Sequence, residues 1–224
     1  MRRTVKDLMT AEVVCASREA PYKELVRLLL DHGLSALPVV DDRDHVVGVV
    51  SEADLLLKEE FRPGIGNDPL LERKHRRIER ANAHGLTAAD VMTTPAVTVG
   101  EHATVAEAAW LLRARGIKRL PVENAVGRLV GIVTRSDLLR VFLRSDEDIR
   151  REVLEKVSPH GHESPSGRFQ VEVRDGTVTL SGRISRRGLA LLVIGAVYGV
   201  DGVVAVEDRL DCQLDDTLLT PVYP

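Results

Sequence analysis

The chain of 224 residues carries 31 basic and 34 acidic residues, a formal net charge of −3, so no overall positive field would draw it onto nucleic acid or anionic lipid. Aromatic residues make up only 3%, which leaves few rings for stacking nucleic-acid bases and predicts an aliphatic core. Two cysteines are too few for a disulfide framework, and the sequence shows neither a signal-peptide pattern nor an apolar run of about 18 residues. We therefore expect a soluble, cytoplasmic protein.

The sequence contains two copies of one unit. Positions 7 and 90 are both aspartate, and this offset of 83 continues without a gap from KDLMT to EADLLL. Agreement of this kind over about fifty residues predicts two copies of a single supersecondary unit. The matched pairs include Met9 and Met92, Gly33 and Gly116, Pro38 and Pro121, Gly48 and Gly131, and Asp54 and Asp137.

Each copy is predicted to begin with a short extended piece, VVCA or AVTV, that leads into a helix. The first helix should begin near Pro21, because proline suits the first helical turn. In the second copy, Thr104 and Glu107 form the spacing of a capping box. Gly33 and Gly116 are expected to end the two helices, where a left-handed backbone is needed.

Two apolar strands and a second helix complete each copy. The strands LPVV and HVVGVV, and LPVE and RLVGIV, are separated by turn-like DDRD and NAVG, so each pair is predicted to form a hairpin. The helix that follows should begin at Ser51 or Thr134, with Asp54 or Asp137 in its first turn.

The hydroxyl and carboxylate at these helix starts are spaced as neighbours on one helical face. A carboxylate can accept hydrogen bonds from both hydroxyls of a ribose, and the free N–H groups of a helix start favour an anion. The same residues could serve only as helix caps, so the bare pattern leaves both interpretations open.

Each β-α-β-β-α unit has MT near its start, an LPV strand, and G-h-h-[ST]-x-x-D at its end, where h is a hydrophobic residue. On these motifs, the two units resemble a tandem pair of cystathionine-β-synthase (CBS) domains, the Bateman module. The resemblance implies an α/β (α+β) fold with pseudo-two-fold symmetry and two clefts, each taking its aspartate from one unit and its adenine wall from the other. One implied cleft contains Thr93, Ala96, Thr98, Ile117, Lys118, Arg119 and Pro121 with Ser51 and Asp54. The other contains Thr10, Val13, Cys15, Leu34, Ser35, Ala36 and Pro38 with Thr134 and Asp137.

The two implied clefts differ in charge. Lys118 and Arg119 stand where the first copy has Ser35 and Ala36. Basic side chains at this position contact phosphates in nucleotide-binding CBS proteins, so the cleft with Asp54 is expected to bind AMP, ADP or ATP. S-adenosylmethionine is a further possible regulatory ligand. No obligatory cofactor is expected. The alternative is that both cations are solvated residues at a strand edge.

Three other features suggest chemistry but have simpler explanations. The linker at 63–86 contains RKHRR, yet its alternating charges favour a solvated or intersubunit helix over a nucleic-acid contact. His160 and His162 lie in a Ser-Pro-Gly stretch typical of a flexible linker, so we expect no metal site. Redox sensing by Cys15 would require a lowered thiol pKa, and no basic residue adjoins it in sequence.

The remainder is predicted to be a second small domain. A helix opened by Ser145 precedes FQVEVRDGTVTLSGRI, a hairpin with Asp175 and Gly176 at its turn; SRRGLALLVIGAVYGV is a second helix and VDGVVAVEDRLDC a final strand. This α-β-β-α-β order, with DG-x-V-x-L-x-G and G-V-x-x-V, resembles a BON domain. That resemblance implies attachment to phospholipid or another surface, and the alternative is a small protein-interaction module.

These patterns predict a regulatory protein rather than an enzyme, since no nucleophile motif is present. The CBS pair would sense an adenosine nucleotide and form a homodimer, and the BON domain would pass the state to a protein or phospholipid partner. A constitutive interaction or envelope-surface attachment protein with non-functional clefts is the alternative. The expected boundaries are 1–62 and 87–143 for the CBS domains, 63–86 for the linker, 144–214 for the BON domain and 215–224 for the tail.

Overall fold

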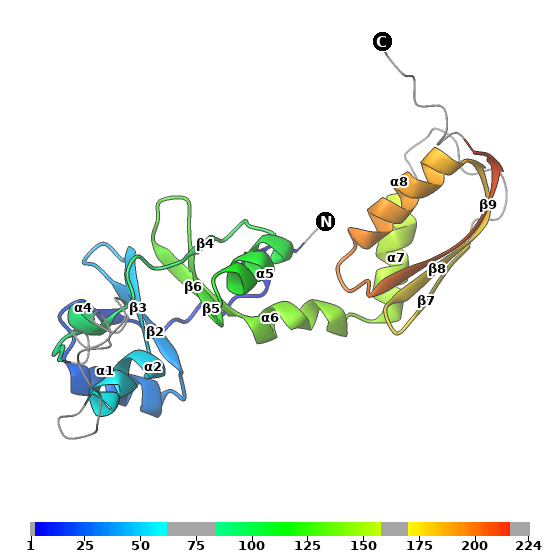
Figure 1. The fold of residues 1–224 in the computed structure, drawn as a ribbon. Coiled ribbons are helices and arrows are strands. Elements are labelled where there is room, and N and C mark those ends of the chain that lie inside the picture. The colour runs from blue at the N-terminus through cyan, green and yellow to red at the C-terminus, as the bar shows by residue number, and fades with distance from the viewer. Residues whose placement is uncertain (1–2, 62–83, 158–169, 216–224) are drawn as a thin grey trace, which may run out of the picture. The chain divides into compact units, whose positions relative to one another are not determined.

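The computed structural model describes residues 3–61, 84–157 and 170–215 (Figure 1). The chain divides into two compact units, one of Thr4–Arg135 and one of Ser136–Pro224 with the first three residues. Most of the expected basic linker, both histidines of the expected flexible stretch and nearly all of the expected tail lie outside the described residues. None of the helices in the described part is long and apolar enough to cross a membrane.

The unit of residues 4–135 is built from two three-stranded sheets of the same design. In each sheet the first strand runs parallel to the second, and the second and third form an antiparallel hairpin, which confirms the predicted repeat. The first repeat consists of η1 (Val5–Asp7), β1 (Ala16–Ser17), α1 (Tyr22–Asp31), β2 (Ala36–Val40), β3 (Val46–Ser51) and α2 (Glu52–Glu60). The second consists of α4 (Ala88–Val91), β4 (Val99–Gly100), α5 (Val105–Ala114), β5 (Arg119–Glu123) and β6 (Leu129–Thr134).

The predicted helix ends are confirmed. Helix α1 begins directly after Pro21, and Thr104 forms a capping box with Glu107 at the start of α5. Gly33 and Gly116 follow the two helices with φ of 61° and 65°, the left-handed backbone that glycine adopts without a steric penalty. Local sequence therefore determines where these helices begin and end.

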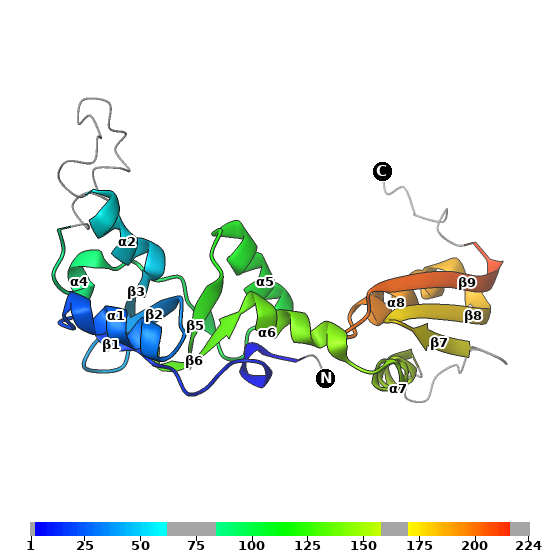
Figure 2. The same cartoon turned by 90° about the horizontal axis from the view of Figure 1, so that it is seen from below.

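An aliphatic core holds the first repeat together. Leu25 of α1, Leu37 and Val39 of β2 and Val50 of β3 have no exposed surface. Helix α1 presents Leu25 and Leu29 to the sheet at the i, i+4 spacing of one helical face, as the sequence predicts. In the second repeat, α5 packs on its own sheet in the same way (Figure 2).

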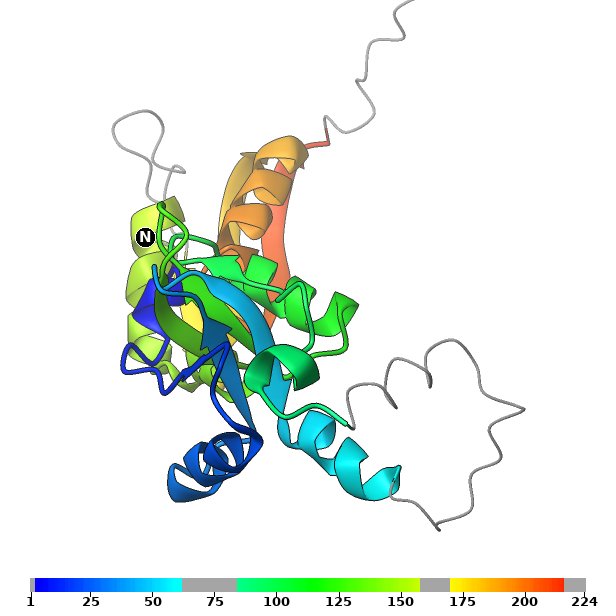
Figure 3. The ribbon, with the colours of Figure 1, turned by 90° about the vertical axis from the view of Figure 1, so that its left-hand side faces the viewer.

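The segment that starts each repeat packs against the other repeat. The N–H of Val5 donates to the carbonyl of Ala103 at 2.9 Å, and the N–H of Ala88 donates to the carbonyl of Ala20 at 2.9 Å. The two hairpins also touch, since the N–H of Leu129 donates to the carbonyl of Asp44 at 2.9 Å, and their strands lie side by side in Figure 3. The repeats are therefore interlocked rather than merely adjacent.

Two strand glycines lie where these starting segments cross the sheets. A Cβ on Gly131 would lie 2.8 Å from Met9 Cγ and 3.1 Å from the Thr10 carbonyl oxygen, and a Cβ on Gly48 would lie 2.8 Å from Met92 Cγ. These crossings have room only for glycine.

We expect Gly131→Ala to lower the free energy of unfolding by about 1–2 kcal/mol, because the added methyl group overpacks a closed contact. Urea denaturation measures this loss. Gly100→Ala is the matched control, since a Cβ there meets no atom within 4 Å. Equal losses in the two variants would contradict the crossing described above.

The second unit has the α-β-β-α-β order predicted from the sequence. Its sheet has the strand order β7-β8-β9, with β7 antiparallel and β9 parallel to β8. Helices α7 and α8 cover one face of this sheet (Figure 1), around a core that includes Ile149, Val178 and Leu180. After α6 (Arg135–Leu139) and η3 (Arg140–Leu143), its elements are α7 (Asp146–Val157), β7 (Gln170–Arg174), β8 (Thr177–Arg186), α8 (Arg187–Tyr198) and β9 (Ala205–Leu214).

The predicted hairpin turn of this unit is confirmed. Asp175 and Gly176 have φ of 49° and 73°, as a tight two-residue turn requires. Both backbone N–H groups donate to the carboxylate of Asp146 at 2.9 Å. The first residue of α7 thus ties this helix to the turn.

A partly buried ion pair links Arg144, which follows η3, to α7 in this unit. Arg144 Nη1 lies 2.7 Å from Glu152 Oε2, and both side chains are 13% exposed; Lys156 Nζ lies 3.1 Å from Glu152 Oε1. Burial acts to raise the pKa of the Glu152 carboxyl, but the hydrogen bonds from Arg144 and Lys156 outweigh it and hold that pKa below the ordinary value of 4.5. A carboxyl group whose pKa is lowered by folding stabilises the folded state at pH values above its ordinary pKa. This stabilisation is lost as the pH falls through the pKa of the folded state.

We therefore expect the free energy of unfolding to fall as the pH drops below 4.5. Glu152→Gln should flatten this part of the curve and cost about 1–2 kcal/mol at neutral pH, because it weakens a charge-assisted hydrogen bond. Denaturation at a series of pH values measures both effects. Glu155→Gln, on the exposed side of α7, is the control, and identical acid curves for the two variants would rule out this role for Glu152.

Candidate functional site

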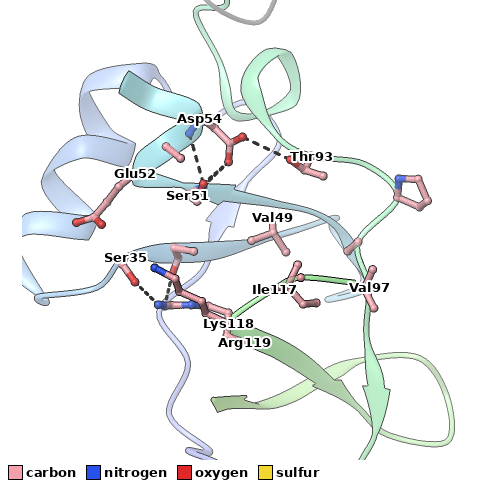
Figure 4. Close-up of a pocket in the computed structure, with 15 residues that line it drawn as sticks. Ser35, Val49, Ser51, Glu52, Asp54, Thr93, Val97, Ile117, Lys118 and Arg119 are labelled. Carbon is pink, nitrogen blue, oxygen red and sulfur yellow. Dashed lines mark hydrogen bonds between the residues drawn. The ribbon is translucent and has the colours of Figure 1, made fainter. Parts of the chain in front are cut away.

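A pocket of about 390 Å³ lies between the two repeats, within the unit of residues 4–135 (Figure 4). Seven of the nine residues predicted for the cleft with Asp54 line it. They are Ser51, Asp54, Thr93, Ala96, Ile117, Lys118 and Arg119. The structure thus brings together side chains that are up to 68 positions apart in the sequence, from 51 to 119.

Thr98 and Pro121, the other two predicted residues, do not line this pocket. Thr98 Oγ1 donates to Glu123 Oε2 at 3.0 Å, and Pro121 pairs with Ile132 inside its hairpin. Thr98 is therefore engaged with the end of β5 and not with the pocket.

Asp54 acts as a helix cap and also faces the pocket. Its Oδ2 accepts hydrogen bonds from the backbone N–H of Ser51 at 2.8 Å and from Ser51 Oγ at 2.6 Å, which completes a capping box at the start of α2. Its Oδ1 points toward Thr93, whose Oγ1 lies 3.5 Å away (Figure 4). The cap thus orients the carboxylate and occupies one oxygen, so the capping and ligand interpretations of this motif are compatible.

Thr93 reaches this position because of the exchange between repeats. It forms an isolated antiparallel bridge with Val49, with N–H to carbonyl distances of 3.1 and 2.9 Å. Val49 belongs to β3, the strand that leads into Ser51, and it lines the pocket itself. The start of the second repeat is thereby joined to the strand that carries the aspartate motif.

The two basic residues of the pocket differ in their surroundings. The guanidinium of Arg119 is half-buried and donates to Ser35 Oγ and, at 3.3 Å, to the Ala36 carbonyl. Burial lowers the pKa of Arg119, and the carboxylate of Glu52 acts in the opposite direction. Lys118 is exposed, and its ammonium group has no hydrogen-bond or ion-pair partner within the described part of the chain.

The pocket also contains two residues that were predicted for the other cleft. Ser35 and Ala36 were expected in the cleft with Asp137, but they line the pocket with Asp54. The reason is strand register, because Ala36 pairs directly with Ser51 across the β2–β3 hairpin. Residues at the start of β2 therefore lie beside the aspartate motif of their own repeat.

The residues predicted for the cleft with Asp137 are divided between the two units. The unit of residues 4–135 contains Thr10, Val13, Cys15, Leu34, Pro38 and Thr134. Asp137 belongs to the other unit, where it is 7% exposed and its Oδ1 lies 3.6 Å from Arg140 Nη1. A second ligand cleft at these residues stays a prediction.

Cys15 does not have the surroundings of a reactive thiol. Burial around the sulfur, and then the carboxylate of Asp44, raise the pKa of its thiol. A thiol with a raised pKa holds less thiolate at neutral pH, which argues against redox sensing.

We accordingly expect Cys15 to react with iodoacetamide at pH 8 more slowly than a free small-molecule thiol. The rate is measured by mass spectrometry in a Cys212→Ser variant, so that only Cys15 is counted, with Cys15→Ser as the blank. A rate above that of the free thiol would show that the surroundings activate Cys15.

Sequence reasoning missed several residues of the pocket, among them Val49, Glu52 and Val97. Val97 stands between the two predicted positions Ala96 and Thr98, where strand alternation would place it on the opposite face, so no sequence signal indicated it. Glu52 follows the motif serine and gives the pocket a second carboxylate, for which the motif carries no signal. No group of three or more histidine, cysteine or acidic residues suited to a metal occurs in residues 3–61, 84–157 and 170–215, and the stretch with His160 and His162 lies outside them.

Comparison with known proteins identifies the family. The CBS domain matches residues 5–59 and 88–144, and the BON domain matches residues 145–213. The chain therefore belongs to the CBS domain family and carries a BON domain after its CBS pair.

Two curated relatives are similar to the CBS part. A CBS domain-containing protein of Dictyostelium discoideum is 31% identical over 160 residues, which cover 71% of this chain and 99% of that protein. An uncharacterized protein of Methanopyrus kandleri is 29% identical over 138 residues, and the match spans only 62% of the length of either protein.

Among solved structures, the crystal structure of CBSX2 of Arabidopsis thaliana in complex with AMP is 30% identical with a TM-score of 0.51. That match covers 62% of this chain and 96% of the CBSX2 chain.

Proposed function

We propose that the chain is a regulatory protein whose CBS pair binds an adenosine nucleotide in the pocket that contains Asp54 and Lys118. The observation that carries the proposal is that this pocket joins the Asp54 carboxylate, held by its own helix cap, to the exposed ammonium group of Lys118 from the other repeat. Support also comes from CBSX2, a similar protein solved with AMP bound.

Each part of the nucleotide has a matching group in the pocket. Asp54 Oδ1 would accept hydrogen bonds from the ribose hydroxyls, with Thr93 beside it. Apolar side chains such as Val49 and Ile117 would pack against adenine, and Lys118 would attract the phosphate. Glu52 adds a negative charge that opposes further phosphates, so we expect AMP to bind more tightly than ATP.

Regulation would follow from the way the pocket is built. Its walls come from both repeats, and Arg119 of the second repeat bonds to Ser35 and Ala36 of the first. A ligand that binds one arrangement of the repeats better than another shifts the equilibrium by that difference in affinity. The BON domain would pass the state to a partner in the cytoplasm.

Self-association through the CBS pair is part of the proposal. Leu30 on α1, Leu56 on α2 and Trp110 on α5 are 73%, 65% and 57% exposed. Large apolar side chains of this kind on helix surfaces favour contact with another protein surface. A homodimer formed through these helices would cover them.

Isothermal titration calorimetry of the full chain with AMP, ADP, ATP and S-adenosylmethionine tests the proposal. We expect saturable binding of AMP, weaker binding of ATP, and a matching rise in melting temperature. Absence of heat and of any melting shift with all four ligands would contradict nucleotide sensing and favour a constitutive interaction protein.

A further inference from the structure

Helix α8 of the second unit is apolar on both of its faces. Ala190 and Val197 are fully buried, and Val193 and Ile194 pack on the same core. The opposite face is also apolar, and its large side chains are 37–72% exposed: Leu189, Leu191, Leu192 and Tyr198. A helix that is apolar all round is typical of a buried helix, yet no residue in the described part of the chain covers this outer face.

The charges around this face do not favour a lipid surface. No charged residue occurs between positions 188 and 198. Of the arginines that precede this stretch, Arg187 lies 2.7 Å from Asp208 and Arg183 lies 3.6 Å from Asp211. Anionic membranes attract clusters of unpaired basic residues. Arg183 and Arg187 are paired with acidic residues of β9, which leaves Arg186 as a single cation rather than a cluster.

Gly195 gives a second, independent observation. It lies in the interior of α8 on the exposed face, and a Cβ added there would meet no atom within 4 Å. Glycine inside a helix is unfavourable relative to alanine, and no contact within the described part of this unit requires it here. Close approach of a second helix backbone does require a residue without a side chain, whereas a lipid surface gains nothing from one.

We propose that α8 is a homotypic contact, in which the outer faces of α8 from two copies of this chain pack antiparallel across a two-fold axis. Leu191 and Leu192 of one copy would lie over Gly195 of the other. In the antiparallel arrangement the dipoles of the two helices point in opposite directions. Arg186, directly before α8 in one copy, then lies beside Asp201, shortly after α8 in the other copy. An uncharged face with opposite charges at its two ends is complementary to itself.

Cross-linking through position 192 tests the contact directly. In full-length protein with Cys15→Ser and Cys212→Ser, L192C is oxidised with copper phenanthroline and compared with V126C, an equally exposed position in the β5–β6 turn (72% and 68%). We expect a covalent dimer from L192C at least tenfold faster than from V126C. Equal rates would overturn the proposal.

Gly195→Leu separates a helix pair from a lipid contact. The leucine blocks close approach of two helices but adds apolar surface for a membrane. We expect G195L to abolish the L192C cross-link, with an unchanged circular dichroism spectrum. Persistence of the cross-link in G195L would overturn the proposal. The proposal would also be overturned if the wild type floated with phosphatidylglycerol vesicles and G195L floated with them more strongly.

Discussion

Asp54→Asn is expected to weaken AMP binding about 100-fold, because it removes the charge from the hydrogen-bond acceptor that we assign to the ribose. The oxygen concerned is Oδ1, since Oδ2 is already engaged by the backbone N–H and hydroxyl of Ser51. Asparagine keeps one oxygen for the cap and replaces the other with a donor, which cannot accept from a ribose hydroxyl. Calorimetric titration with AMP measures the loss.

The chain supplies a matched control for the capping role. Asp90 forms the same box at the start of α4, where its Oδ2 accepts from the N–H and hydroxyl of Thr87, both at 2.9 Å, and it does not line the pocket. Asp90→Asn should therefore lower stability as Asp54→Asn does, while AMP affinity stays at the wild-type value. Similar losses of affinity in the two variants would mean that Asp54 acts only as a cap.

Lys118→Glu is expected to weaken AMP binding about 30-fold, since it removes the free ammonium group and places a carboxylate against the phosphate. The side chain is exposed, so the fold should tolerate the change. Adenosine, which has no phosphate, should bind wild type and variant equally. The difference between AMP and adenosine thus isolates the contribution of the phosphate.

Lys23→Glu serves as the control for net charge, because Lys23 is exposed on α1 and lies outside the pocket. Titrations at two salt concentrations should show a smaller salt dependence of AMP affinity for Lys118→Glu than for Lys23→Glu. An equal drop for AMP and adenosine in Lys118→Glu would place the phosphate elsewhere.

Much of the fold could be predicted from the sequence because the signals are local. The paired hairpins follow from apolar runs separated by turns, and the caps at Thr104 and Ser51 follow from hydroxyl and acid spacing. The Asp175–Gly176 turn predicts the hairpin of the second unit in the same way. In each case one short segment contains the residues that determine the structure.

The exchange of starting segments could not be predicted in this way. Both segments repeat with the same offset of 83. The sequence pattern would therefore be the same whether each segment packed on its own repeat or on the other one. The close approach of Met9 to Gly131, and of Met92 to Gly48, appears only in three dimensions. This exchange brings Thr93 to Asp54, so part of the site depends on it.

Strand register explains why Ser35 and Ala36 line the pocket with Asp54. The motif resemblance separated Ser35 and Ala36 from Ser51, although the β2–β3 hairpin pairs Ala36 with Ser51. Glu52 was overlooked because a solvated first-turn acid is common at helix starts. In the structure Glu52 lines the pocket at the start of α2, and its carboxylate acts on Arg119 of the second repeat (Figure 4).

A crystal structure of the chain grown with AMP would show whether the nucleotide occupies the pocket that contains Asp54 and Lys118. We expect the nucleotide in the pocket between the repeats, with its ribose hydroxyls within hydrogen-bond distance of Asp54 and its phosphate beside Lys118. AMP bound at another place, or a ribose turned away from Asp54, would contradict it.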